Sequence, residues 1–258
     1  MIGRVEADRE VRGAFLVRSG STQQSWVDPG DPLRLEFEYV QRIAEALRAT
    51  VLRRPEEPRL RVVHLGGGGM TLPRWLAAVR PGTAQIVCEP DADLLAEVRR
   101  KLPLDRHAGI KVRTTDGRAG VAAMPGDYAD ALIVDAFDGL HVPGSLATRE
   151  FFADAGRVLR ADGVLLMNLA DQAPFGWARS CLAGIARTFP HLLVTAETAV
   201  WKGRRYGNLV VLGSRVALPL ADLEEAARHA LFGYRASTGA ALRRWIGGAE
   251  PFPDDAAQ

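Results

Sequence analysis

The sequence predicts an α/β fold built around a mostly parallel β-sheet, and three observations lead to this class. From Leu60 onward, short apolar runs rich in β-branched residues alternate with stretches of helical periodicity. The apolar runs are nearly continuous, which is typical of strands covered by helices on both faces. Hydrophobic residues make up 47% of the 258 residues, which is enough for a sizeable core.

The apolar runs predict seven strands, and the periodic stretches predict five helices. The expected strands are Arg61–Leu65, Gln85–Glu89, Lys111–Thr115, Ala131–Asp135, Gly163–Leu169, Leu192–Thr195 and Asn208–Gly213. The expected helices are Leu72–Val79, Asp91–Leu102, Thr148–Leu159, Trp177–Phe189 and Leu220–Leu231. Segment 197–206 shows no helical pattern, so the last two strands are expected to be antiparallel neighbours. Seven strands with an antiparallel last strand form the layout of the Rossmann-like class I methyltransferase fold.

The first fifty residues follow a different pattern. Val11–Arg18 and Gln23–Asp28 alternate loosely around a Ser-Gly-Ser-Thr turn cluster, which predicts a short β-hairpin. Apolar residues at helical spacing then predict an amphipathic helix over Leu33–Ala49, and two prolines in the next stretch mark a linker. We therefore expect an N-terminal hairpin and helix over residues 1–50 and a Rossmann-like catalytic domain over residues 51–258.

Composition and charge narrow the class of partner. The chain has 33 Lys and Arg against 31 Asp and Glu, a balance that calls for neither a nucleic acid nor an anionic membrane as partner. It has no long uninterrupted apolar run, and its N-terminus is charged, so we expect a cytoplasmic protein without a membrane segment. The tail from Glu250 onward, which contains Pro and Asp, is expected to fray.

The cysteine and histidine patterns give no sign of a metal site. Cys88 and Cys181 cannot form a disulfide framework, and their apolar neighbours predict two small buried residues. The five histidines are scattered without metal-ligand spacing, so no metal is expected. The sequence also lacks a nucleophile elbow and a Walker lysine.

In an open parallel sheet, ligands bind beyond the carboxyl ends of the strands. The first expected strand runs into Gly66–Gly69, and glycine lets the backbone approach a ligand closely. The dinucleotide fingerprint would need glycine or alanine where Thr71 stands, so that motif is incomplete. The second strand ends at Glu89, where a carboxylate can accept hydrogen bonds from ribose hydroxyls. Together these features favour a nucleoside site.

Acidic residues also follow the third and fourth strands. Asp116, before Gly117, can accept a hydrogen bond from an adenine amino group or cap the next helix, and the residues leave both open. Asp135 and Asp138 stand where the sheet opens, and two acids in one cleft are costly unless they meet a cation or share a proton. An amine substrate would satisfy both, and a turn capped by Asp138 before Gly139 is the alternative.

At these positions the sequence resembles the spermidine synthase (polyamine aminopropyltransferase) family. The resemblance rests on Gly66-Gly67-Gly68, Glu89-Pro90-Asp91, Asp116-Gly117, and Asp135-Ala136-Phe137-Asp138 with Pro143. Upstream, Glu36–Gln41 is similar to the family's helix whose tyrosine lines the amine channel, and the likeness covers Gln23 to Gly213. It implies a transferase that moves an aminopropyl group from decarboxylated S-adenosylmethionine to a small polyamine.

The resemblance also implies a role for each matched residue. The donor, decarboxylated S-adenosylmethionine or S-adenosylmethionine, would be bound by Gly66, Gly67, Gly68, Glu89, Asp116 and Gly117. In the acceptor site, Asp135 would take a proton from the amine or orient it, Asp138 would stabilise a second ammonium, and Gln24 and Tyr39 would bind the substrate. No metal is implied, and assembly as a homodimer is left open.

Three departures from the family pattern matter for the donor and the acceptor. The aspartate of the family's glycine loop, which faces the ammonium of the donor, is Gly69 here; Gly139 replaces a proline, and the N-terminal β-region is shorter. We therefore expect position 69 to face the donor chain and to help decide which donor is used. An S-adenosylmethionine-dependent methyltransferase is the alternative function, and a non-catalytic nucleoside-binding protein of the same fold is the second alternative.

Overall fold

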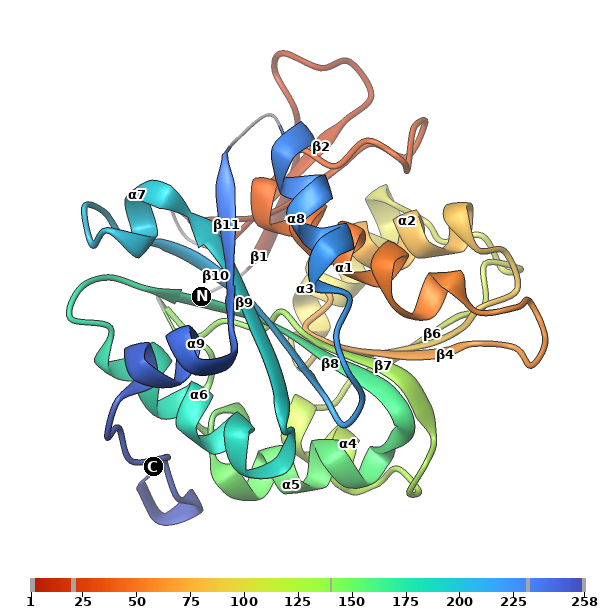
Figure 1. The fold of residues 1–258 in the computed structure, drawn as a ribbon. Helices are drawn as coiled ribbons and strands as arrows, with labels where there is room; N and C mark the ends of the chain where they lie inside the picture. Colours follow the sequence, from red (N-terminus) through yellow and green to blue (C-terminus); the bar gives the residue numbers. More distant parts are fainter. Residues whose placement is uncertain (1–2, 20–21, 140, 231–232, 257–258) are drawn as a thin grey trace.

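The structure, a computed structural model, describes residues 3–19, 22–139, 141–230 and 233–256. These residues form a three-stranded antiparallel sheet near the N-terminus and an eight-stranded sheet that is covered by helices (Figure 1). The expected α/β class is confirmed. None of the helices in these ranges is long and apolar enough to cross a bilayer.

The large sheet contains the seven expected strands and one more. In chain order its strands are β4 (Arg61–Leu65), β5 (Ala84–Cys88), β6 (Ile110–Arg113), β7 (Ala129–Val134), β8 (Leu159–Asp171), β9 (His191–Glu197), β10 (Gly207–Ser214) and β11 (Tyr234–Thr238). They lie side by side in the order β11-β9-β10-β8-β7-β4-β5-β6. Strands β4 to β8 are parallel, and β10 is antiparallel to both β8 and β9, which confirms the predicted pairing of the last two expected strands.

The expectation of seven strands is corrected to eight. Strand β11 pairs antiparallel with β9 and forms one edge of the sheet. Its sequence, Tyr-Arg-Ala-Ser-Thr, has no continuous apolar run, and only Tyr234 is buried. An edge strand that is half exposed needs no such run, so the pattern of a buried parallel strand does not detect it.

Helices cover both faces of the large sheet. Their bounds are α1 (Glu38–Ala49), α2 (Thr71–Val79), α3 (Ala92–Lys101), α4 (Gly117–Ala122), α5 (Arg149–Val158), α6 (Gly176–Thr188), α7 (Thr198–Trp201), α8 (Leu220–His229) and α9 (Gly239–Ile246), with 3-10 turns at Val51–Arg53, Gly144–Leu146 and Asp254–Ala256. Apolar residues of α1, α2 and α8 form a buried cluster with one face of the sheet. Those of α4, α5, α6 and α9 form another with the opposite face (Figure 1).

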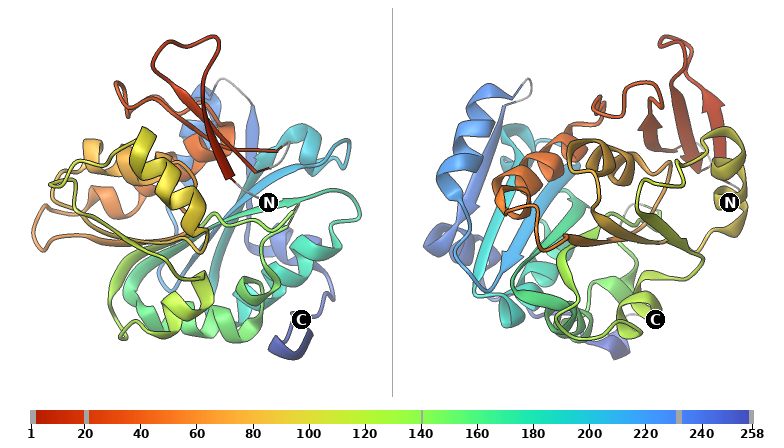
Figure 2. Two further views of the ribbon diagram at one scale, coloured as in Figure 1. Left: turned by 180° about the vertical axis from the view of Figure 1, so that it is seen from behind. Right: turned by 90° about the vertical axis from the view of Figure 1, so that its right-hand side faces the viewer.

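The N-terminal hairpin is part of a three-stranded sheet, which corrects a second expectation. Strands β2 (Phe15–Ser19) and β3 (Thr22–Val27) form the predicted hairpin, and β1 (Gly3–Ala7) adds a strand to it. Strand β1 was not predicted because its sequence is charged and Val5 is its only buried apolar residue. The sheet packs on α3 at one side of the molecule (Figure 2), whereas α1 joins the main core. A domain boundary at residue 50 stays a prediction.

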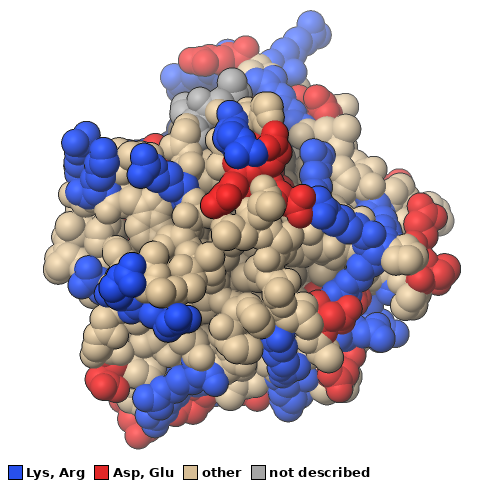
Figure 3. All heavy atoms as spheres, in the orientation of Figure 1, with Lys and Arg blue, Asp and Glu red and all other residues tan. Residues whose placement is uncertain are grey.

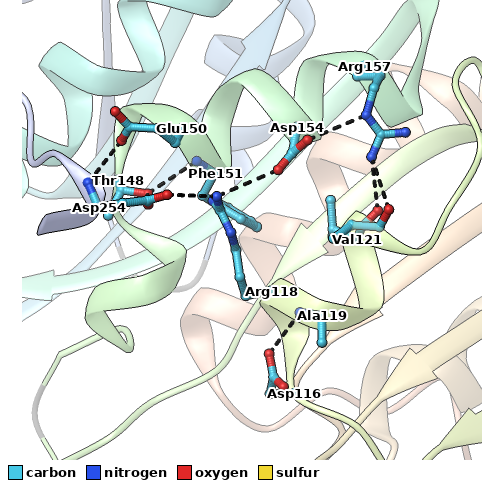
Figure 4. A network of polar contacts seen from close by, with 11 residues as sticks. Asp116, Arg118, Ala119, Val121, Thr148, Glu150, Phe151, Asp154, Arg157 and Asp254 are labelled. Carbon is cyan, nitrogen blue, oxygen red and sulfur yellow. Dashed lines mark hydrogen bonds and ion pairs between the residues drawn. The ribbon is translucent and has the colours of Figure 1, made fainter. Parts of the chain in front are cut away.

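The described part of the C-terminal tail, up to residue 256, is packed, which corrects the expectation that it frays. Asp254 accepts hydrogen bonds from Thr148 Oγ1 (2.6 Å) and Arg118 Nη2 (3.0 Å), and its N–H donates to Glu150 (Figure 4). The Phe252 carbonyl also accepts from a backbone N–H of α5. Composition alone suggested a disordered end, but these contacts with residues more than 100 positions away tie the tail to α4 and α5.

Candidate functional site

A cavity lies at the carboxyl ends of the central strands, between the sheet, the N-terminal ends of α1 and α2, and strand β3. The space between its lining residues is about 430 Å³, a volume that includes open solvent at the mouth. Its lining residues are Gln24, Ser25, Trp26, Phe37, Tyr39, Val40, His64, Gly66, Gly67, Thr71, Leu72, Pro73, Ile133 and Asp135. Four of the predicted site residues, Gln24, Tyr39, Gly66 and Gly67, therefore meet Asp135 in one place. Among the described residues, Asp135 is the only carboxylate in the lining.

The strand order explains why the cavity forms here. Strand β4 lies between β5 and β7. From β4 the chain first adds β5 and β6 on one side of the sheet, and it then crosses back to add β7 and β8 on the other side. Ligands of open α/β sheets bind at such a switch point. The glycine loop follows β4 and Asp135 follows β7, so both lie at its edge. Gly66 has φ of +91°, and a Cβ there would lie 2.3 Å from the Asp135 carbonyl oxygen, so only glycine fits.

Asp135 combines partial burial with two hydrogen bonds. Asn168 Nδ2 donates to its Oδ1 at 3.0 Å, and the Tyr39 hydroxyl donates to its Oδ2 in a long contact of 3.4 Å. Burial raises the pKa of Asp135 to about 6, although both hydrogen bonds act to lower it. Burial also raises the pKa of Tyr39, so this hydroxyl keeps its proton and remains a donor. A carboxylate with a raised pKa in a cavity is typical of a general base.

Asn168 links Asp135 to a row of polar groups that the sequence analysis missed. Asn208 Nδ2 donates to Asn168 Oδ1 at 2.9 Å, and the Asn208 carbonyl accepts from Arg42 Nη2 at 3.1 Å. The buried Arg42 also donates to the Thr195 carbonyl at 2.7 Å. The one available signal was a polar residue inside the strongly apolar run of β8, since a buried amide needs partners.

We expect Asn168→Leu to move the acid limb of the pH–activity profile to higher pH. Asn168 donates to the Asp135 carboxylate and lowers its pKa, so removing this donor raises that pKa further. A base is active only when deprotonated, and activity then falls at a higher pH as the pH is lowered. The measurement is kcat/KM from pH 5 to 9 for both proteins. An unchanged acid limb would show that Asn168 does not act on Asp135.

Glu89 binds the glycine loop in this structure. Its Oε2 accepts from the backbone N–H of Gly67 at 2.9 Å and of Gly68 at 3.3 Å, and its Oε1 accepts from Asp91 at 3.1 Å. Glu89 is nearly buried at the end of β5. The predicted ribose carboxylate and the predicted donor loop are thus in direct contact, and the role of Glu89 toward ribose stays a prediction.

Gly69 does not face the cavity, which corrects the expectation that it faces the donor chain. A Cβ at this position would lie 2.6 Å from Val27 Cγ2 and 3.0 Å from Val17 Cγ2. Its N–H donates to Ser25 Oγ at 3.1 Å. Position 69 is therefore covered by strands β2 and β3, a contact between segments that local sequence does not reveal.

We expect Gly69→Asp to lower stability without selecting a donor. The added carboxylate would overlap the two valines, and overpacking of this kind costs about 1–3 kcal/mol. Thermal unfolding and the ratio of dissociation constants for S-adenosylmethionine and its decarboxylated form are the measurements. Gly176→Asp is the matched control because Gly176 faces open space. A stable Gly69→Asp protein with a changed donor ratio would contradict this placement.

The remaining predicted residues lie outside the cavity lining. Asp116 is exposed and caps α4, with its Oδ1 accepting from Ala119 N–H at 2.8 Å (Figure 4). Gly117 is buried against Leu65 and Leu146. Asp138 is exposed, and its backbone pairs with that of His141. The adenine role of Asp116 and the ammonium role of Asp138 stay predictions.

Charge on the surface is mixed. On the face drawn in Figure 3, basic and acidic side chains surround a broad uncharged region. In the described part of the chain, no group of three His, Cys, Asp or Glu residues is placed to hold a metal ion. Both cysteines are buried and free, as expected from their apolar neighbours.

Comparisons with known proteins give a consistent picture. No protein-family profile matches the chain. A polyamine aminopropyltransferase of Vibrio vulnificus is 30% identical over 159 residues, which are 60% of this chain and 51% of the relative. A polyamine aminopropyltransferase of Pyrobaculum calidifontis is 30% identical over 208 residues, which are 76% of this chain and 66% of the relative. The chain thus spans about half to two thirds of the length of these curated relatives.

Solved structures extend the likeness over nearly the whole chain. A probable spermidine synthase from Corynebacterium glutamicum matches with a TM-score of 0.90 and 29% identity, covering 98% of this chain and 92% of that protein. Human methyltransferase-like protein 13 matches with a TM-score of 0.61 and 22% identity, covering 85% of this chain and 96% of that protein. The second match shows the fold alone, and it supports the predicted methyltransferase layout.

Proposed function

Because the chain is a spermidine synthase-like protein, we propose that it transfers an aminopropyl group from decarboxylated S-adenosylmethionine to a small amine. One observation carries the proposal: of the residues that the structure describes, Asp135, with its raised pKa, is the only carboxylate lining a cavity at the switch point of the sheet. A single base beside the donor loop is what amine alkylation needs.

In the proposed reaction, Asp135 frees the nucleophile. An alkyl amine with a pKa near 10 arrives mostly as an ammonium, so it must lose one proton before its lone pair can attack. Asp135 accepts that proton, and its raised pKa makes it a better base than an ordinary carboxylate. The nitrogen then forms a bond to the aminopropyl carbon that is attached to sulfur. The C–S bond breaks, its electron pair stays on sulfur, and the rest of the donor departs as a neutral thioether.

The donor would lie along the glycine loop. Gly66 and Gly67 line the cavity, and Glu89 accepts from the backbone N–H groups of Gly67 and Gly68. In the proposal, Glu89 exchanges its bonds to the loop for ribose hydroxyls, and Asp116 reaches the adenine amino group. The sulfonium is already an activated leaving group, so positioning and charge complementarity supply most of the rate.

Methyl transfer from S-adenosylmethionine is the second candidate function. It is favoured by the position of Gly69, which places no acid toward the ammonium of a donor and so offers no means of preferring the decarboxylated form. The nucleoside contacts would be the same in both reactions.

Mass spectrometry of products tests these functions. The protein is incubated with 1,4-diaminobutane and each donor separately, and donor binding is measured by calorimetry. An aminopropylated diamine formed only with decarboxylated S-adenosylmethionine supports the proposal. A methylated amine formed with S-adenosylmethionine supports the second candidate. Donor binding without any product identifies a non-catalytic nucleoside-binding protein and overturns both.

A further inference from the structure

His64 is a polar residue in an otherwise largely apolar part of the cavity. It lies on β4, is 2% exposed, and lines the cavity together with Ile133, Leu72 and Pro73. Its position in a buried strand would fit an apolar residue, and neither the fold nor the proposed proton transfer uses it. A buried polar side chain needs a hydrogen-bond partner, so both of its ring nitrogens have to be accounted for.

The contacts of Gln85 determine the tautomer of His64. Gln85 Nε2 donates to the Pro73 carbonyl at 3.0 Å, and a carbonyl can only accept. The other end of this amide, Oε1, therefore faces His64 Nε2 at 2.9 Å and must accept from it. The proton is thus on Nε2, and Nδ1 carries a lone pair. No described residue donates to Nδ1, so the ring presents a vacant acceptor in the cavity lining.

His64 stays neutral over the physiological range. Burial lowers its pKa to about 4, more than the hydrogen bond to Gln85 raises it. A neutral imidazole does not repel a cation, and its lone pair attracts an N–H donor. Among the described residues, Asp135 is the only carboxylate in the cavity lining. Two further carboxylates at the same edge of the sheet are paired with arginines: Glu38 with Arg42, and Glu197 with Arg205.

The register of the sheet places His64 at a defined distance from Asp135. His64 pairs with Ile133 on the parallel neighbour β7, and Asp135 is two residues further along that chain. Side chains two residues apart point to the same face, so His64 and Asp135 face the cavity together. Two residues along a strand and one step across the sheet give a Cα separation of about 8 Å.

We infer that His64 Nδ1 accepts a hydrogen bond from the second nitrogen of a short alkane diamine whose first nitrogen is deprotonated by Asp135. The inference rests on the proposed function, and it assigns the second nitrogen to His64 rather than to Asp138, which is exposed and lies outside the cavity lining. His64 is then a specificity-determining residue, and Gln85 is a positioning residue that fixes the tautomer.

Two substitutions of His64 separate this role from a structural one. His64→Asn keeps an acceptor near the position of Nδ1 but loses the bond to Gln85. His64→Gln keeps a donor near the position of Nε2 but loses the acceptor. The measurements are KM and kcat for 1,4-diaminobutane and for n-butylamine at a saturating donor concentration, together with calorimetric titration of both amines into the donor-bound protein.

We expect wild type and His64→Asn to prefer the diamine about tenfold in KM, as for one hydrogen bond to a charged group, and His64→Gln to lose this preference with kcat little changed. A diamine preference kept in His64→Gln, or lost in His64→Asn alone, would overturn the inference. The calorimetric titration measures the preference for the diamine over the monoamine even when the protein transfers no group. Failure of the proposed function therefore appears as missing product, whereas failure of this inference appears as unchanged amine preference.

Discussion

Asp135→Asn is expected to reduce turnover by about 10²–10⁴-fold while donor affinity stays close to that of the wild type. Asparagine keeps the shape of the side chain and can still accept from Asn168, but it cannot take a proton from the amine. The measurements are kcat with 1,4-diaminobutane and calorimetric titration of the donor. A variant that retains more than about a tenth of the activity would show that this carboxylate is structural.

Stability provides the control for this variant. Because the pKa of Asp135 is raised in the folded protein, the ionised carboxylate at pH 7 to 8 disfavours folding, and replacing it should not lower the melting temperature. Lost activity with an unchanged or higher melting temperature therefore separates catalysis from folding. Asp162→Asn, which changes an exposed carboxylate on β8, is the matched variant and should keep wild-type turnover.

Glu89→Ala is expected to weaken binding of any adenosyl donor tenfold or more. Hydrogen bonds to a charged acceptor contribute roughly 1.5–3 kcal/mol each, and the proposed ribose contact makes two of them. The variant also removes the bonds that hold Gly67 and Gly68 in place. The measurement is calorimetric titration with S-adenosylmethionine and with its decarboxylated form.

The control for Glu89 lies on the next helix. Asp93→Ala removes an exposed carboxylate from the first turn of α3 and leaves the loop contacts intact, so donor affinity should not change. Donor affinity of Glu89→Ala within twofold of the wild type, in a protein that still folds, would remove the nucleoside assignment.

The sequence by itself determined the succession, along the chain, of the strands and helices that frame the site. Near-continuous apolar runs occur where a strand is buried on both faces, and this local requirement made β4, β5, β7, β9 and β10 predictable to within a few residues. It also located part of the longer β8, whereas the edge strand β6, which has no buried residue, was predicted from its β-branched residues. It also placed the glycine loop, Glu89 and Asp135, because residues that follow parallel strands lie at one edge of the sheet. The edge strands β1 and β11 were not predicted because their half-exposed sequences lack a continuous apolar run.

Only the tertiary structure decided which groups meet in the cavity. Asn168 reaches Asp135 from another strand, and Gln85 orients His64 from a neighbouring one. Gly69 turns toward β2 and β3 because these strands, more than forty residues upstream, pack over the loop. Local patterns report the burial that each segment requires. Hydrogen-bond partners and close contacts depend on the packing of distant segments, and this packing determines the tautomer of His64, the pKa of Asp135 and the direction of position 69.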